Sequence, residues 1–181
     1  NKSIKLIVFG ASNISKSINK KLATYAGSLL LKKLKDAHME ILDLNDFELP
    51  LFGADLEERI DPPENAKAFL AKLAEADAII ISFTEHNHSY TVAWKNLFDW
   101  CTRIEKSVFQ DKPVVLLSTS PGSRGGANVM ERALKSLPSY GADIKANLSI
   151  PSFFDNFDMQ SGELKNPELK QQLEQAVSTL R

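Results

Sequence analysis

Short apolar runs alternate with longer amphipathic stretches along the whole chain. The apolar runs span roughly five to seven residues and barely alternate, which indicates strands buried on both faces, as in a parallel sheet covered by helices. The amphipathic stretches repeat apolar residues at helical spacing. The expected strands are 4–10, 39–44, 78–83, 113–119 and 144–150. The expected helices are 17–37, 63–76, 90–104, 126–140 and 166–180.

Five strands alternating with five helices predict a doubly wound α/β fold in a single domain, residues 1–181. The length fits a flavodoxin-like three-layer sandwich, with five parallel strands in the order 2-1-3-4-5, better than the longer six-strand dinucleotide fold. Two connections, 45–62 and 151–165, are long for a compact domain, which hints at function or assembly.

Composition narrows the class of protein further. The net charge of -1 gives no basic surface for nucleic acid. The apolar runs are far shorter than the roughly 20 residues that a membrane span needs. A single cysteine, Cys101, excludes an internal disulfide and favours a reducing compartment. We therefore expect a cytoplasmic protein with neither nucleic-acid nor membrane partners.

Three segments follow expected strands at the edge where open parallel sheets bind ligands. They are "GASNISKSIN" (10–19), "TEHNHS" (84–89) and "STSPGSRGG" (118–126). The first opens a helix, whose free N–H groups suit a phosphate, and its serines add donors. The glycines of the third let the backbone approach a ligand closely. A capped helix start and a flexible turn are the purely structural alternatives.

The second segment could serve either of two chemistries. Glu85, His86 and His88 lie within four positions, as in some metal sites. A metal site needs three or four ligands held by the fold, and the sequence has no second cluster of histidine or cysteine to complete it. We therefore expect no metal, and favour a loop that holds something flat and polar. A role in structure alone stays open.

The segments "GASNISKSINKKL", "SFTEHNHS", "WKNLFDW" and "STSPGSRGG", in this order, resemble the NAD(P)H-dependent FMN reductases, which include quinone, azo-dye and chromate reductases. The resemblance runs from about residue 4 to 150. It implies a non-covalent FMN, reduced by NAD(P)H, that passes electrons to a small quinone, azo, nitro or metal-oxyanion acceptor. No side chain is required as a catalytic acid or base. A homodimer or homotetramer is implied, with 90–104 between subunits.

The resemblance also implies which residues hold the cofactor. Ser12, Ser17 and Asn19 would surround the phosphate, while Ile14 stands where the family has arginine. His86 would pack on or beside the flavin ring in place of the family's tyrosine. The expected cofactor-binding residues are Ser12, Ser17, Ile18, Asn19, Thr84, Glu85, His86, Asn87, Ser120, Pro121, Gly122 and Gly125.

Departures from the family pattern cluster in this site, at Ile14, Thr84, His86 and His88. They keep two other functions open: a flavodoxin-like electron carrier, and a binding protein that has lost FMN. Within the second segment, Asn87 is expected to hydrogen-bond the polar edge of the ring. Glu85 is instead expected to tie its loop to the start of a helix behind it.

The helix at 90–104 carries three large aromatic residues. Trp94 and Phe98 share one face at helical spacing, and that face must meet the sheet. Trp100 lies well around the helix from both, so we expect a partner subunit to cover it. Cys101 is expected to be a packed thiol with no special reactivity.

Overall fold

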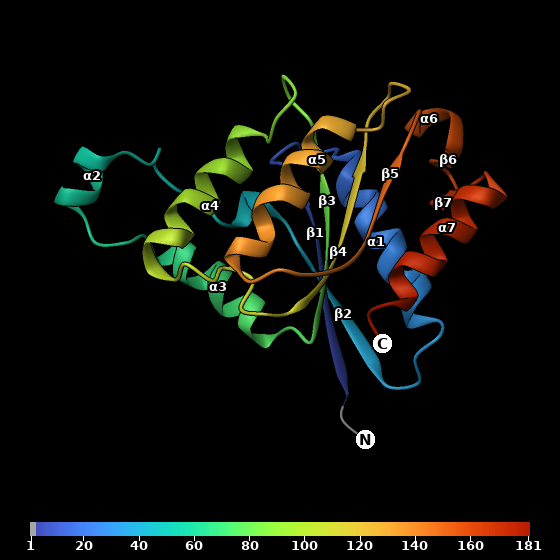
Figure 1. The fold of residues 1–181 in the computed structure, drawn as a ribbon, viewed down its shortest axis with the longest axis horizontal. Helices are drawn as coiled ribbons and strands as arrows, with labels where there is room; N and C mark the ends of the chain where they lie inside the picture. Colours follow the sequence, from blue (N-terminus) through green and yellow to red (C-terminus); the bar gives the residue numbers. More distant parts are fainter. Residues whose placement is uncertain (1–2) are drawn as a thin grey trace.

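Five strands form one parallel sheet in the computed structural model, which describes residues 3–181; residues 1 and 2 of the expected domain lie outside that part. The strands are β1 (Ile4–Ala11), β2 (Ala37–Leu42), β3 (Ala78–Phe83), β4 (Pro113–Thr119) and β5 (Asp143–Ile150). Their order is β2-β1-β3-β4-β5 and every neighbouring pair is parallel. The expected flavodoxin-like topology is therefore confirmed (Figure 1).

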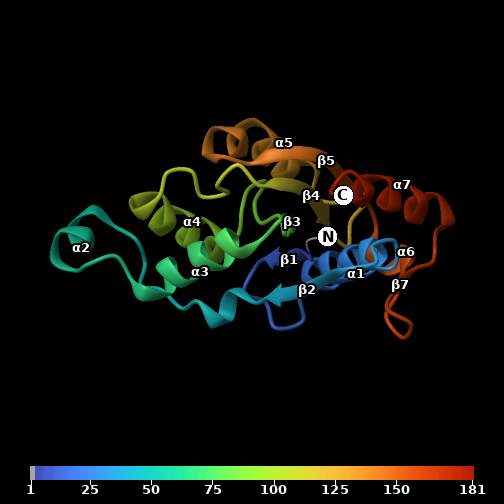
Figure 2. The same cartoon turned by 90° about the horizontal axis from the view of Figure 1, so that it is seen from below.

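Helices cover both faces of this sheet (Figure 1 and Figure 2). One face carries α3 (Glu64–Glu75), α4 (Val92–Ile104) and α5 (Ala127–Ser136), and the other carries α1 (Ile18–Leu31) and α7 (Pro167–Ser178). Successive side chains of the interior strand β1 alternate between the two layers. Ile7 and Phe9 are buried on the α3–α4 side, whereas Leu6 and Val8 are buried against α1. Burial on both faces explains the nearly continuous apolar run.

None of the helices formed by residues 3–181 has the length and apolar character needed to cross a membrane.

The first helix is shorter than expected. It ends at Leu31 and not at residue 37, and its last turn tightens as Lys33 N–H donates to the Leu30 carbonyl at 2.9 Å. The chain must leave the helix there, because Asp36 already accepts a hydrogen bond from Ile4 at the start of β1. Consequently β2 begins and ends two residues earlier than the expected 39–44.

Both long connections contain short elements that the sequence pattern did not predict. The first holds a 3-10 helix, η1 (Leu44–Asp46), and α2 (Ala54–Arg59). The second holds α6 (Phe153–Asn156) and a small antiparallel pair, β6 (Phe157–Asp158) with β7 (Glu163–Leu164). We call residues 50–62 the arm, since α2 lies well away from the sheet in Figure 2 and buries no residue.

The arm provides the cover for Trp100, so the expectation that a partner subunit must cover it is wrong. The Trp100 side chain is 0% exposed within the chain. Its Nε1–H donates to the Pro50 carbonyl at 2.8 Å. Its ring packs edge-on against the Phe52 ring, with 5.0 Å between the ring centroids. The neighbouring Cys101 is buried too, and desolvation raises the pKa of its thiol to about 12, which confirms the expected packed thiol.

Replacing Trp100 by alanine should lower the free energy of unfolding by about 3–5 kcal/mol, because it empties a large core site and removes the arm's anchor. Urea unfolding followed by circular dichroism measures the change. The control is Met159→Ala in the turn between β6 and β7, where the side chain is 50% exposed and a change within about 0.5 kcal/mol is expected. A loss below about 1 kcal/mol for Trp100→Ala would contradict this packing.

Candidate functional site

The three loops that follow β1, β3 and β4 meet around one cavity of about 300 Å³ at the carboxyl end of the sheet. Most of the expected cofactor-binding residues line it, whereas Ser12, Asn87, Gly122 and Gly125 do not. The lining residues are Ile14, Lys16, Ser17, Ile18, Asn19, Thr84, Glu85, His86, Thr119, Ser120, Pro121 and Phe154. The sequence predicts that the three loops meet, but its pattern does not identify Lys16, Thr119 and Phe154 as lining residues.

The loop after β1 presents unused hydrogen-bond donors at the start of α1. Ser17 is the N-cap of this 14-residue helix, and its hydroxyl oxygen accepts from Lys20 N–H at 3.0 Å. Ser12 stabilises the loop by accepting from Ile14 N–H at 3.0 Å. The backbone N–H groups of residues 15–19 donate to no acceptor within residues 3–181. Free donors at the positive end of a helix suit an anion such as a phosphate.

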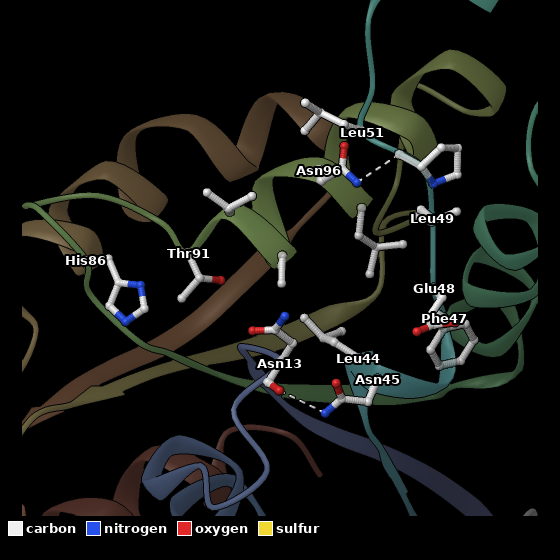
Figure 3. A pocket seen from close by; sticks show the side chains of 14 residues that line it. Asn13, Leu44, Asn45, Phe47, Glu48, Leu49, Leu51, His86, Thr91 and Asn96 are labelled. Carbon is white, nitrogen blue, oxygen red and sulfur yellow. Dashed lines mark hydrogen bonds between the residues drawn. The ribbon is translucent and has the colours of Figure 1, made fainter. Parts of the chain in front are cut away.

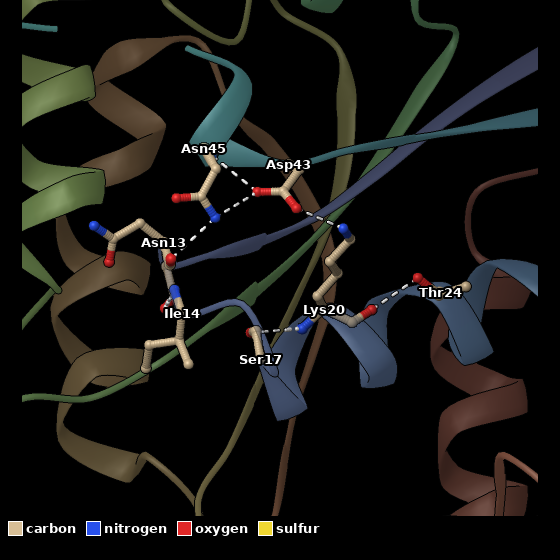
Figure 4. Close-up of polar contacts among 8 residues, drawn as sticks. Asn13, Ile14, Ser17, Lys20, Thr24, Asp43 and Asn45 are labelled. Carbon is tan, nitrogen blue, oxygen red and sulfur yellow. Dashed lines mark hydrogen bonds and ion pairs between the residues drawn. The ribbon is translucent and has the colours of Figure 1, made fainter. Parts of the chain in front are cut away.

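A chain of polar contacts fastens the same loop to the end of β2 (Figure 4). Lys20 Nζ lies 2.7 Å from Asp43 Oδ2, and this hydrogen bond holds the pKa of the Asp43 carboxyl below its usual value. Asn45 Nδ2 donates to Asp43 Oδ1 and to the Asn13 carbonyl, each at 3.0 Å. The first loop is thus fixed by the protein's own contacts.

Asn19 joins α1 to the two neighbouring strand ends. Its Nδ2 donates to Thr84 Oγ1 at 3.0 Å and to the Thr119 carbonyl at 3.1 Å. Its Oδ1 accepts from Ser82 Oγ at 2.6 Å and from Thr119 N–H at 3.0 Å. The side chain is 0% exposed, and these four bonds occupy both its donors and both its acceptor positions. Asn19 therefore positions all three loops, and a direct contact with a cofactor stays a prediction.

The loop after β3 turns back on itself at its tip. His86 and Ser89 exchange two backbone hydrogen bonds at 3.0 Å, and the residues between them have positive φ, 51° at Asn87 and 66° at His88. Positive φ at both central positions is typical of a type I′ turn, which favours asparagine and glycine. Asn87 is exposed at this tip and lies outside the cavity. Its expected contact with the flavin ring stays a prediction.

Glu85 ties this loop to the start of α5. One carboxylate oxygen accepts from Val129 N–H at 2.7 Å, and the other accepts from Asn128 Nδ2 at 3.4 Å. A carboxylate at this end of a helix also interacts favourably with the helix dipole. The tie that we expected between Glu85 and a helix start is confirmed.

The two histidines of this loop face different surroundings. His88 Nδ1 lies 2.6 Å from Asn128 Nδ2 on α5, whereas His86 lines the cavity. Within residues 3–181 there is no group of three or more histidine, cysteine, aspartate or glutamate residues that could hold a metal ion. The geometry of the loop therefore gives no support to a metal site.

The loop after β4 depends on a glycine. Gly125 has a φ of +60°, and a Cβ added there would lie 2.6 Å from the Ile150 carbonyl oxygen. Ser118 Oγ donates to the Gly125 carbonyl at 2.7 Å and lies equally close to Ser149 Oγ on β5. The absence of a side chain at Gly125 thus lets the loop lie against the end of β5.

The same loop carries the turn that follows β5. Ser152 N–H donates to the Gly122 carbonyl at 2.8 Å, and Phe153 N–H donates to the Ser120 carbonyl at 3.0 Å. These bonds hold Phe154, which is 53% exposed, at the wall of the cavity. This contact could not be predicted from the sequence, because residues 151–165 have no hydrophobic pattern of a helix or strand.

A second and larger cavity, of about 730 Å³, lies beside the first (Figure 3). It is formed mainly by residues 44–51 and by the first turns of α4. His86 lines both cavities and so lies at their boundary. Leu51 and Val92 also line it, although their side chains are 73% and 74% exposed.

Comparison with known proteins identifies the same family that the sequence motifs resemble. The model of the family described as NADPH-dependent FMN reductase matches residues 4–155. An NADPH:quinone oxidoreductase of Arabidopsis thaliana is 32% identical over 68% of this chain, and a quinone reductase of Escherichia coli is 32% identical over 54%. The matches span 61% and 52% of the length of those relatives.

The fold is similar to that of FerB, a flavoenzyme NAD(P)H:(acceptor) oxidoreductase from Paracoccus denitrificans. The two structures superpose with a TM-score of 0.79 at 24% identity, covering 98% of this chain and 94% of FerB.

Replacing Asn19 by alanine should lower the free energy of unfolding by about 3 kcal/mol or more, because it leaves several buried polar groups of β3 and β4 without partners at about 1–3 kcal/mol each. Chemical denaturation measures the change. Asn65→Ala is the control, since Asn65 is half-buried and donates one bond, to the Glu48 carbonyl. Equal losses in the two variants would show that the Asn19 bonds add nothing special.

Proposed function

Because the chain belongs to the NADPH-dependent FMN reductase family, we propose that it is an oxidoreductase that holds FMN, accepts electrons from NAD(P)H and passes them to a small quinone-like acceptor. The observation that carries this proposal is the cavity shared by the three loops. Its lining combines backbone N–H groups at a helix start, which have no acceptor within residues 3–181, with a histidine ring, an aromatic ring and a proline.

These two sets of groups fit the two ends of FMN. The N–H groups of residues 15–19 and the Ser17 hydroxyl match the phosphate, because they are donors at the positive end of α1. His86, Pro121 and Phe154 offer flat or apolar surface to the isoalloxazine ring. When bound, the flavin supplies the redox chemistry, and the protein supplies position and electrostatics.

We further propose that the larger cavity receives the nicotinamide and then the acceptor. Its lining joins apolar side chains, such as Leu44 and Leu97, to polar ones, such as Asn96 and Thr91. A mixed lining of this kind suits a small aromatic molecule with polar substituents. His86 borders both cavities, so it is placed to contact the flavin on one side and the second reactant on the other.

The purified chain should bind FMN and oxidise NADPH when a benzoquinone is present. Quenching of flavin fluorescence measures binding, and the loss of NADPH absorbance measures turnover, with FMN omitted as the control. EDTA should leave both unchanged. FMN binding without NADPH or NADH oxidation would favour an electron carrier. Absence of FMN binding would refute the proposed function and leave a binding protein that has lost the cofactor.

We propose that the chain acts as a homodimer, or as a homotetramer built from dimers, in the cytoplasm. The helix α2 buries none of its residues, and it is joined to α4 by an ion pair between Glu57 and Arg103 at 2.7 Å. Leu51 in the arm and Val92 on α4 both have exposed apolar side chains, and both line the larger cavity. A second subunit seated on this surface would bury it and would close the larger cavity.

Light scattering at micromolar concentration should therefore give at least twice the mass of one chain. The double variant Leu51→Asp with Val92→Asp should shift the equilibrium toward the monomer, because it places charges where apolar surface would be buried. Ile41→Asp is the control, since Ile41 is 42% exposed on β2 and lines neither cavity. A monomeric parent protein would refute the assembly.

A further inference from the structure

The end of the cavity that the start of α1 forms has backbone N–H groups with no acceptor within residues 3–181. Ile14, which lines this end, is apolar and 46% exposed. Glu85 is the one carboxylate among the residues that line the cavity, and both of its oxygens are occupied by hydrogen bonds to α5. A phosphate monoester carries nearly two negative charges at neutral pH. A charged partner would make its hydrogen bonds roughly twice as strong as neutral ones.

Three lysines, Lys16, Lys20 and Lys21, lie close to this end of α1. The positions of Lys20 and Lys21 exclude them as partners of a phosphate in the cavity. Lys20 is held by Asp43 at 2.7 Å, on the β2 side of the loop (Figure 4). Lys21 lines a neighbouring cavity of about 460 Å³ along α1, and it does not line the cavity of the three loops.

Lys16, unlike Lys20 and Lys21, both lines the cavity and has no carboxylate partner within residues 3–181. It lies in the turn directly before the N-cap Ser17, and it lines the cavity of the three loops as well as the neighbouring one. Its side chain is exposed, and no carboxylate in the described part of the chain lies within 4.0 Å of its ammonium group. It is thus the one lysine that borders the cavity with its charge unpaired.

We propose that Lys16 is the cation that pairs with the phosphate of FMN in this protein. The inference rests on the proposed function, and it assigns the phosphate contact to a residue that carries no expectation from the sequence. In this arrangement the backbone N–H groups of residues 15–19 and the Ser17 hydroxyl fix the position of the phosphate. Lys16 adds the charge that these neutral donors lack, and it folds over the phosphate from the turn.

A lysine that pairs with the phosphate must distinguish FMN from riboflavin, which has the same ring but no phosphate. Its removal should therefore weaken FMN binding and leave riboflavin binding unchanged. The loss should also shrink as salt is added, because the pair lies at an exposed site where ions screen it. A lysine that merely supports the fold would affect both flavins alike.

The experiment titrates FMN and riboflavin into the full chain and into Lys16→Ala, Lys16→Arg and Lys21→Ala, at low and high salt, with flavin fluorescence as the readout. Lys16→Ala should weaken FMN binding by about tenfold or more at low salt, the size of a lost charge-assisted bond. Its riboflavin affinity should stay within about twofold of the parent. Lys16→Arg should retain FMN binding, and Lys21→Ala, with the same change of charge, should behave as the parent does.

The outcomes separate this inference from the proposed function. If the parent binds FMN and Lys16→Ala binds it equally well, the assignment of Lys16 is wrong and the proposed function stands. Equal losses for FMN and riboflavin in Lys16→Ala would likewise overturn the assignment, as would an equal loss of FMN in Lys21→Ala. If the parent binds neither flavin, both the proposed function and the assignment fail.

Discussion

The contact between β1 and α1 at Gly10 is the constraint on which the site depends. A Cβ on Gly10 would lie 2.6 Å from Lys20 N, so only glycine lets the helix start lie this close to the strand. This closeness brings the Asn19 amide to the ends of β3 and β4, where it bonds Ser82, Thr84 and Thr119. The polar groups at those strand ends would otherwise be buried without partners, which is costly.

The contact between β1 and α1 also positions the loops that follow β3 and β4. Because Asn19 fixes the ends of β3 and β4, the loops that leave them start side by side. Each is then fastened from behind, the β3 loop by Glu85 on α5 and the β4 loop by the turn after β5. The site is therefore held by hydrogen bonds within the protein.

The sequence predicted the sheet, its strand order and the meeting of the three loops, because burial on two faces leaves a plain pattern and parallel strands end at one edge. It did not predict features that depend on contacts far apart in the chain. The end of α1 is set by Asp36 pairing with Ile4 at the start of β1. The sequence does not predict that Pro50 and Phe52 cover Trp100, because they come from a loop with no pattern of its own.

Electrostatics explains why the motif alone could not settle how a phosphate is held. Of the charged groups at the site, Glu85 is committed to α5, and Lys20 is committed to Asp43. Both contacts join residues far apart in the sequence. The segment "SNISKSINK" therefore does not reveal which of its lysines lacks a carboxylate partner. If Lys16 pairs with the phosphate as proposed, the loop needs no arginine at position 14 to match a dianion. Under the proposed assignment, neutral donors at the helix start fix the position of the phosphate, and Lys16 in the adjoining turn supplies the charge.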